Sequence, residues 1–373
     1  METVNQKHKV KATVISPLSI GQSSEKDWVE GIDYIRADNT LYHLNMQLMA
    51  DSDISMEKLS ALYASGETNK IKDYLQGKLK EIHDFSMNMP ISSVNPVKTF
   101  YFNPITAKYV LSGSSLKGAI RSAVFHSLVQ NEAIDELHRK GNGLDRYVFG
   151  DIADGTNFMR FIRIGDFDFE KTELINTKIY NLWKDHAGNK WQGGWKHKKA
   201  DTNCSFNDVG FNTIYECLMP RAEAYGFIMV SSLLYSNISA QMRFKEEKDR
   251  IMRGSPIHRL FSVVNEATLS YLEKEIRFFE AYPQGRYSER IIASLKHYHE
   301  LASTLSASNG NDCLVKMSAG TGFHSITGDW QYDDYTKTGC DYQTGKKRFK
   351  SRKIACFNGQ FTPMGFLKLQ IVE

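Results

Sequence analysis

The chain has 373 residues, 41% of them apolar, which is the size and composition of a globular protein with about two domains. Its formal net charge of +4 is too small to establish a nucleic-acid partner, so the positions of the charges matter more than their sum. Five cysteines, none in a C-x-x-C pair, argue against a disulfide framework or a cysteine-ligated zinc site and favour a cytoplasmic protein. The polar N-terminus lacks a signal-peptide core and no stretch is long enough to span a bilayer, so we expect no membrane partner.

The first elements follow strand and helix patterns that are easy to separate. Apolar and polar residues alternate over residues 10–14, and this period of two predicts a half-buried strand. Residues 31–49 are typical of a hairpin that turns near Asp38. Residues 55–86 follow a helical pattern that is interrupted at Gly66.

The most informative segment predicts a strand, a tight turn and a helix in succession. A short strand at 109–111 ends at a Ser-Gly pair, and a helix follows for which Ser114 or Ser115 suits the N-cap. Apolar residues from Leu116 to Leu128 recur at i, i+3, i+4, i+7, i+8 and i+12. This spacing places them on one face of the helix.

The middle of the chain carries an insertion between strand patterns. Residues 159–169 are typical of a strand, and strand signals return at 213–232. Between them, residues 171–205 contain three of the five tryptophans, a glycine pair and several lysines, which indicates an inserted loop or hairpin. The tryptophans either form a stacking platform for bases or anchor a small local core.

A boundary is predicted near 236–256, where a charged segment gives way to a serine and a proline that suit the start of a helix. We therefore predict an N-terminal domain of residues 1–240, with its insertion near 171–205, and a C-terminal domain of residues 241–373. The order strand, helix, strands occurs twice, which favours an α+β fold of two modules. The elements expected in the C-terminal domain are helices at 257–282 and 288–305 and strands at 314–318 and 366–372.

The turn before the first long helix is a candidate RNA-binding site, formed by Gly113, Ser114, Ser115, Lys117 and Arg121. A glycine turn that leads into a capped helix presents free backbone N–H groups and the positive end of the helix dipole, and this geometry binds phosphate. Lys117 and Arg121 lie one turn apart on one face, where both can reach a nucleic-acid backbone. An ordinary strand-to-helix turn with solvated basic residues has the same pattern, so both interpretations stay open.

Two further segments are candidate RNA-binding surfaces. The first is a glycine-rich loop at 318–328, where glycines allow close approach to a ligand and aromatic rings can stack on bases. The second is a run at 346–353 with six basic residues in eight and no acid. The alternatives are a hairpin with a bulge and a solvated charged surface. The candidate residues are Gly320, Gly322, Phe323 and His324 in the loop and Lys346, Lys347, Arg348, Lys350, Arg352 and Lys353 in the basic run.

Patterns for catalysis and metal binding are weak. His297 and His299 lie about 200° apart on a predicted helix, which makes them a poor pair of metal ligands. Asp166 and Asp168 share one face of a strand and can bind a divalent ion, but such a pair more often ends a strand at the solvent. His324 can act as a general base in RNA cleavage, but no acid or base partner is indicated nearby. We therefore predict no catalytic residue, no metal and no cofactor.

The order of these segments is similar to that of the RAMP superfamily of CRISPR systems. It resembles most closely the Csm-type subunits that cap the 3′ end of the guide RNA in the type III-A interference complex. The helix start Ser-Ser-Leu-Lys-Gly is the most specific part of the likeness, whereas 171–205 and 329–345 contribute nothing to it. The segments that carry the resemblance are Ser16–Gly21, Ser112–Arg121, Phe149-Gly150, Arg163–Asp166, the loop at 318–328 and Gly365-Phe366.

The resemblance implies two ferredoxin-like, RRM-related modules with helical and loop insertions. It implies a non-catalytic subunit that binds guide (CRISPR) RNA at Gly113–Arg121 and at the glycine-rich loop. The expected partners are the neighbouring backbone RAMP subunit, other subunits of the effector complex and a maturation nuclease to which the 3′ end is presented, all in antiviral defence. Asp27 and Asp33 lie where backbone subunits carry a cleaving aspartate, but capping subunits are not generally regarded as the cutters.

Two alternatives to this function stay open at the level of the sequence. A metal-independent endoribonuclease that processes CRISPR repeat RNA would use a related fold, with His324 as its first candidate base. A protein-only scaffold would use the basic segments to hold acidic partners.

Overall fold

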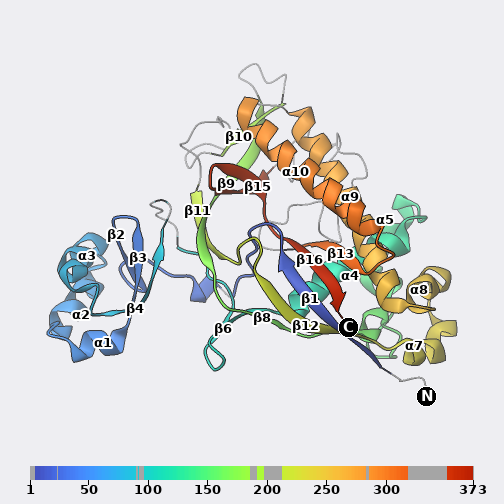
Figure 1. Ribbon diagram of the computed structural model, residues 1–373, viewed down its shortest axis with the longest axis horizontal. Coiled ribbons are helices and arrows are strands. Elements are labelled where there is room, and N and C mark those ends of the chain that lie inside the picture. Colours follow the sequence, from blue (N-terminus) through green and yellow to red (C-terminus); the bar gives the residue numbers. More distant parts are fainter. Residues whose placement is uncertain are drawn as a thin grey trace.

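The computed structural model describes residues 5–22, 24–89, 91, 96–184, 191–196, 212–282, 285–317 and 351–372, and the architecture is α+β (Figure 1). A five-stranded sheet forms the centre of the protein. A second sheet and two long helices lie beside it, and a small unit of strands and short helices projects from the opposite side. None of the described helices is long and apolar enough to cross a membrane.

The central sheet joins the two ends of the chain. Its strands in spatial order are β13 (Asp312–Lys316), β16 (Phe366–Val372), β1 (Gln6–Val14), β12 (Glu223–Val230) and β7 (Ile162–Ile164). Strand β1 is antiparallel to both of its neighbours, so the first and last strands of the chain lie side by side, blue and red in Figure 1. The alternation predicted for β1 is confirmed, because its even-numbered apolar residues are buried and its lysines face outward.

Two helices cover the apolar face of this sheet. Helix α4 (Gly113–Val129) buries Leu116, Ile120 and Val124, which confirms its predicted apolar face. Helix α9 (Pro256–Ala281) begins at the predicted proline and packs its first half against the same core. The sheet and the core combine elements from both sides of the boundary predicted near residue 240, so the two predicted domains share one hydrophobic core.

Helix α9 also closes one edge of the sheet. Asn265 donates to the carbonyl of Asp312 at 3.0 Å and accepts from the N–H of Leu314 at 2.9 Å. Thr268 donates to the carbonyl of Leu314 at 2.6 Å. An open edge strand would expose unpaired N–H and C=O groups to other chains, and these side chains satisfy them instead.

The second sheet packs against the later part of α9 and against α10 (Gly285–Ser306). Its strands are β9 (Glu173–Lys184), β10 (Trp191–Trp195), β11 (Asn212–Cys217), β14 (Ser351–Phe357) and β15 (Gln360–Pro363). Pairing of β9 with β10 confirms the predicted hairpin in the insertion. Trp195 is fully buried there beside Tyr180, so this tryptophan anchors a core and is not a stacking platform.

The projecting unit has a small core of its own. Its elements are β2 (Tyr34–Ala37), β3 (Thr40–Leu44), β4 (His83–Asn88), α1 (Met46–Asp51), α2 (Met56–Ser65) and α3 (Thr68–Leu75). The predicted hairpin and the break at Gly66 are confirmed, since Gly66 ends α2 in a left-handed conformation. The helical prediction is wrong after residue 78, where a 3-10 turn at Gln76–Lys78 ends the helical segment. Residues 83–88 form a strand with alternating burial because they pair with β3.

The remaining elements connect these layers. They are β5 (Phe102–Asn103), β6 (Lys108–Leu111), β8 (Phe167–Phe169), α5 (Ile134–Lys140), α6 (Leu144–Phe149), α7 (Ser232–Ile238) and α8 (Lys245–Met252). The prediction of one strand over 159–169 is wrong. A 3-10 turn at Phe158–Phe161 precedes β7, and a short turn separates β7 from β8, which joins another sheet.

One ion pair is buried between the second sheet and α9. The Arg352 Nε lies 2.9 and 2.8 Å from the two carboxylate oxygens of Glu275, and the two side chains are only 3% and 2% exposed. The guanidinium also stacks over the ring of Phe278 at 3.9 Å. Arg352 was predicted to contact RNA as part of a basic run. Its charge is instead matched inside the protein, so we do not place it on an RNA-binding surface.

Removal of one partner of this pair should be far more damaging than removal of both. Arg352→Met leaves the Glu275 carboxylate buried without a counter-charge and should lower the free energy of unfolding by about 3–5 kcal/mol. Adding Glu275→Leu to the same chain should recover most of that loss. Urea unfolding of the two single variants and the double variant measures the coupling. A double variant that is as unstable as Arg352→Met would show that packing, not charge compensation, is the role of the arginine.

Candidate nucleic-acid interface

The start of helix α4 is held by hydrogen bonds within the chain. The Ser112 hydroxyl accepts from the Ser114 N–H at 3.2 Å, and the Ser112 carbonyl accepts from Ser115 and Leu116 at 3.1 Å. The cap is therefore Ser112, and the prediction of Ser114 or Ser115 is wrong by two or three residues. Ser112 takes the cap because its backbone is still extended, with ψ at 129°, whereas the helix has begun at Gly113.

The turn at Gly113 packs closely against the connection between β7 and β8. The Gly113 N–H donates to the Asp166 carboxylate at 2.7 Å. A Cβ at Gly113 would lie 2.2 Å from the carbonyl oxygen of Ile164, so only glycine fits this position. The backbone N–H groups predicted to be free for phosphate thus already have partners. Any contact of this turn with RNA must come from side chains.

The two cations predicted to act together have different surroundings. Arg121 pairs with Asp145 of α6 and stacks over the ring of Phe149 at 4.3 Å, which fixes it to the protein. Lys117 is half-buried and has no hydrogen-bond, ion-pair or ring partner among the described residues. Burial and the positive charge of Arg163 both lower the pKa of Lys117. Lys117 and Arg163, an exposed residue of β7 with no described partner, therefore form a pair of like charges without a counter-ion.

The outward face of the central sheet continues from this pair. Arg163 is opposite Met229, which is opposite Lys7 on β1, so the three side chains form one row across the sheet. The next row places Lys9 opposite Phe227. The Lys7 ammonium lies 4.3 Å from the centre of the Phe227 ring.

Tyr225 extends the same face by one further row. The Lys9 ammonium lies 5.0 Å from its ring centre, and the tyrosine is 55% exposed. A face that combines cations with partly exposed aromatic rings suits single-stranded nucleic acid, since phosphates pair with the cations and bases stack on the rings. We call the set Lys7, Lys9, Lys117, Arg163, Tyr225 and Phe227 the sheet-face surface.

Sequence reasoning missed most of the sheet-face surface. The alternation that predicts β1 also turns its lysines outward, and that signal was present at Lys7 and Lys9. Their pairing with aromatic residues of β12, more than 200 positions later, has no local signal.

The other predicted contact residues are placed as follows. Lys353 is half-buried against Tyr215, and burial together with Lys98 lowers the pKa of Lys353 to about 8. Together with the burial of Arg352, this leaves the described part of the basic run without an exposed cation. The predicted residues outside the described ranges are Gly320, Gly322, Phe323, His324, Lys346, Lys347, Arg348 and Lys350.

The aspartates considered in the sequence have structural partners. Asp27 pairs with Lys98, and Asp33 accepts from the Val29 N–H at 2.7 Å. Asp166 holds the turn at Gly113, as described above. Across the described ranges, no three His, Cys, Asp or Glu side chains are grouped so that they can hold a metal ion.

The arrangement defines an α+β protein in which a curved antiparallel sheet packs on a helix that starts from a Ser-Gly turn. The sequence profile of the RAMP superfamily matches residues 11–302. The chain belongs to the RAMP superfamily. A search of curated proteins found no match.

Two solved structures share this fold over nearly their whole length. One is a chain of a Csm-crRNA-target RNA ternary complex in a type III-A CRISPR-Cas system, with a TM-score of 0.66 and 16% identity, covering 98% of this chain and 100% of that one. The other is Csm5 of T. onnurineus, with a TM-score of 0.62 and 15% identity, covering 97% of this chain and 100% of that one. At this identity the likeness concerns the fold.

Two glycines of α4 offer a matched test of the turn. Gly113→Ala places a methyl group against the carbonyl of Ile164 and should destabilise the protein by about 1–3 kcal/mol, the cost of overpacking. Gly118→Ala, in the same helix with open space around it, should stabilise the protein slightly because alanine favours the helix. Thermal and urea unfolding measure the stability of each variant against that of the unmodified protein. Equal stability of the two variants would contradict the close contact at Gly113.

Proposed function

We propose that the chain is a non-catalytic RNA-binding subunit of a type III-A CRISPR effector complex, in which it caps the 3′ end of the guide RNA. The observation that carries the proposal is the full-length similarity of fold to a chain of a Csm complex with crRNA and target RNA and to Csm5. Membership in the RAMP superfamily supports it. Its partners are the guide RNA, the neighbouring backbone RAMP subunit, other subunits of the complex and a maturation nuclease that trims the 3′ end. As part of such a ribonucleoprotein, it would act in the cytoplasm.

The sheet-face surface is the part of the described structure best suited to hold RNA. Lys117 and Arg163 repel each other and have no described counter-ion, so a phosphate between them would relieve that repulsion. Lys7 and Lys9 already lie over aromatic rings, and those rings offer stacking surfaces for bases of any sequence. This combination favours binding that depends on the backbone and on stacking, as a subunit that accepts different guides requires.

The proposal does not assign catalysis to the described aspartates. Asp27, Asp33 and Asp166 each hold a lysine or a backbone N–H, so their carboxylates serve the fold. The candidate base of the endoribonuclease alternative, His324, lies outside the described residues. That alternative stays a prediction, and cleavage of repeat RNA by the chain alone in the presence of a chelator would establish it.

Loss of the two unpaired cations should weaken RNA binding and reduce its salt dependence. Lys117→Ala with Arg163→Ala removes two phosphate contacts, so we expect affinity for guide RNA to fall about tenfold or more. The slope of log K against log salt concentration should become less steep by about 1.4 for a single strand. Filter binding or fluorescence anisotropy across a salt series measures both quantities.

The matched control removes the same charge elsewhere. Lys70→Ala with Lys80→Ala lies in the projecting unit, where both lysines are exposed. This variant should keep the affinity and the salt slope of the unmodified protein. An equal loss in both double variants would indicate a general effect of net charge, and no loss in the first would remove Lys117 and Arg163 from the interface.

The place of the chain in a complex is tested by co-purification. The tagged chain, expressed with its neighbouring genes, should bring down short RNAs with a uniform 5′ end and one spacer each. Deleting the chain should leave guides with longer, uneven 3′ ends, because no subunit then defines where trimming stops. Recovery of no RNA would contradict the proposal, and guides with unchanged 3′ ends after deletion would refute the capping role.

A further inference from the structure

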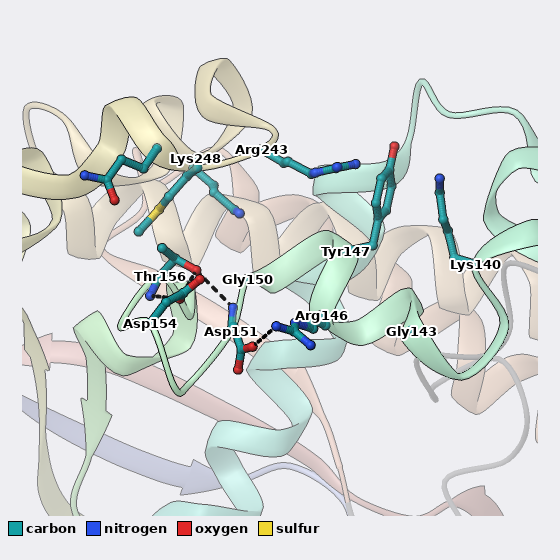
Figure 2. Close-up of a pocket in the computed structure, with 12 residues that line it drawn as sticks. Lys140, Gly143, Arg146, Tyr147, Gly150, Asp151, Asp154, Thr156, Arg243 and Lys248 are labelled. Atoms are coloured by element: carbon teal, nitrogen blue, oxygen red, sulfur yellow. Dashed lines mark hydrogen bonds and ion pairs between the residues drawn. The ribbon is translucent and has the colours of Figure 1, made fainter.

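A pocket of about 480 Å³ lies between helix α6, the loop that follows it and the start of helix α8 (Figure 2). The loop turns sharply at Gly150, where φ is +92° and a Cβ would lie 2.5 Å from the carbonyl oxygen of Thr156. Asp151 donates its N–H to the Thr156 hydroxyl at 3.0 Å, which closes the loop on itself. The volume is within the range of small-molecule sites, which is roughly 300–1,000 Å³.

The most unusual residue of the pocket is Lys248. Its side chain is only 1% exposed, yet it has no hydrogen bond or ion pair with any described residue. Burial lowers the pKa of Lys248 to about 8, although Glu247 acts in the opposite direction. In Figure 2 its ammonium points into the space above the loop that carries Asp151 and Thr156. The ammonium lies 5.8 Å from the centre of the Phe158 ring, a contact that does not neutralise its charge. A buried cation without a counter-ion costs stability, and an anion in the pocket would offset that cost.

A second cation without a carboxylate partner lies nearby. Arg243 is exposed and has no ion pair among the described residues, and its guanidinium lies 4.6 Å from the ring centre of Tyr147. Lys140 lies 4.4 Å from the same ring, and Tyr147 is between the two cations in Figure 2. Lys140 pairs with Glu136 at 2.7 Å, a carboxylate that it shares with Arg139. Arg243 therefore brings a second unmatched positive charge to the pocket.

The carboxylates of the pocket offset these charges only in part. Asp151 pairs with Arg146. Asp154 accepts from the Thr156 hydroxyl at 2.6 Å and from its N–H at 2.9 Å, and these bonds lower the pKa of Asp154. Asp151 is therefore matched by a cation, whereas Asp154 keeps its negative charge, because its bonding partner Thr156 is neutral. Set against the two positive charges of Lys248 and Arg243, this single charge leaves the pocket with a positive balance.

We propose that this pocket is a binding site for a phosphate group of a nucleotide-sized ligand, held by Lys248 and Arg243. A guanidinium can donate two hydrogen bonds to a phosphate, and an ammonium adds a point charge. The ammonium of Lys248 is buried, which strengthens its attraction for a phosphate. The phosphate belongs either to a free nucleotide or to a terminal nucleotide of RNA. The site is separate from the sheet-face surface and does not depend on the guide-binding function.

The test uses the full-length protein and titration calorimetry with AMP, adenosine and inorganic phosphate as probes. AMP and phosphate should bind, and adenosine should not, because it lacks the phosphate. Lys248→Met and Arg243→Gln should each weaken AMP binding about tenfold or more, the effect of losing one charge-assisted contact. Lys245→Met is the matched control. It removes a lysine of the same helix that pairs with Asp249 outside the pocket, and AMP binding should not change.

Folding of the variants is checked by thermal unfolding. Lys248→Met removes a desolvated charge, so the variant should be at least as stable as the unmodified protein. Reduced binding with retained stability would support a ligand-binding role for Lys248. Because Arg243 is exposed, Arg243→Gln provides a second test that does not disturb the core.

Binding of short RNAs with and without a terminal phosphate shows whether the bound phosphate belongs to an RNA end or to a free nucleotide. Preference for the phosphorylated RNA, lost in Lys248→Met, would assign the site to an RNA end, whereas AMP binding without that preference would assign it to a free nucleotide. The proposal is overturned if no phosphate-bearing probe binds, or if neither variant changes binding. The Lys117 and Arg163 variants report on guide binding independently, so failure of one proposal is distinguishable from failure of the other.

Discussion

The rest of the structure depends on the antiparallel pairing of β1 with β16 and β12. Strands from opposite ends of the chain meet at the centre of the sheet, where register determines which side chains are buried. The side-chain period of a strand is two, so a shift of one residue would bury the lysines of β1 and expose Val10, Ala12 and Val14. The apolar face fixes that register. In doing so it also fixes the cations on the opposite face, so the core and the proposed RNA surface are two results of one constraint.

Four of the segments that carry the family resemblance are bonded to one another in two pairs. Phe366 donates its N–H to the Ser16 hydroxyl at 2.9 Å, and Gly365 donates to the carbonyl of Pro17 at 2.8 Å. The turn at Gly113 is bonded to Asp166 in the same way. The turn at Gly113, which resembles a phosphate-binding loop in the sequence, therefore connects distant parts of the chain. Close packing of backbone explains the glycine at Gly113, and the RNA contacts that we propose come from side chains outside these turns.

Sequence patterns predicted the elements whose signal is local. The alternation of β1, the apolar face of α4 and the proline start of α9 follow from periods of two and 3.6 residues and from capping chemistry within a few positions. The helix cap could not be assigned in this way, because Ser112, Ser114 and Ser115 have equal capping chemistry and the choice depends on contacts with β7. The helical pattern was extended to residue 86 for a similar reason, since the pairing of residues 83–88 with β3 is non-local.

Charged residues show most clearly where sequence reasoning ends. Arg352 belongs to a basic run that looks like a nucleic-acid surface, but Glu275, 77 residues away, neutralises it in the core. Lys248 is one lysine in an ordinary amphipathic helix, but it is buried beside a pocket with no counter-ion among the described residues. Charge density along the chain favours Arg352 as a ligand contact and does not single out Lys248, which is the reverse of what we infer from the structure. The source of the compensating anion decides whether a buried cation serves the fold or a ligand. For Arg352 the tertiary structure supplies that anion, the Glu275 carboxylate. For Lys248, on our proposal, the ligand supplies it as a phosphate.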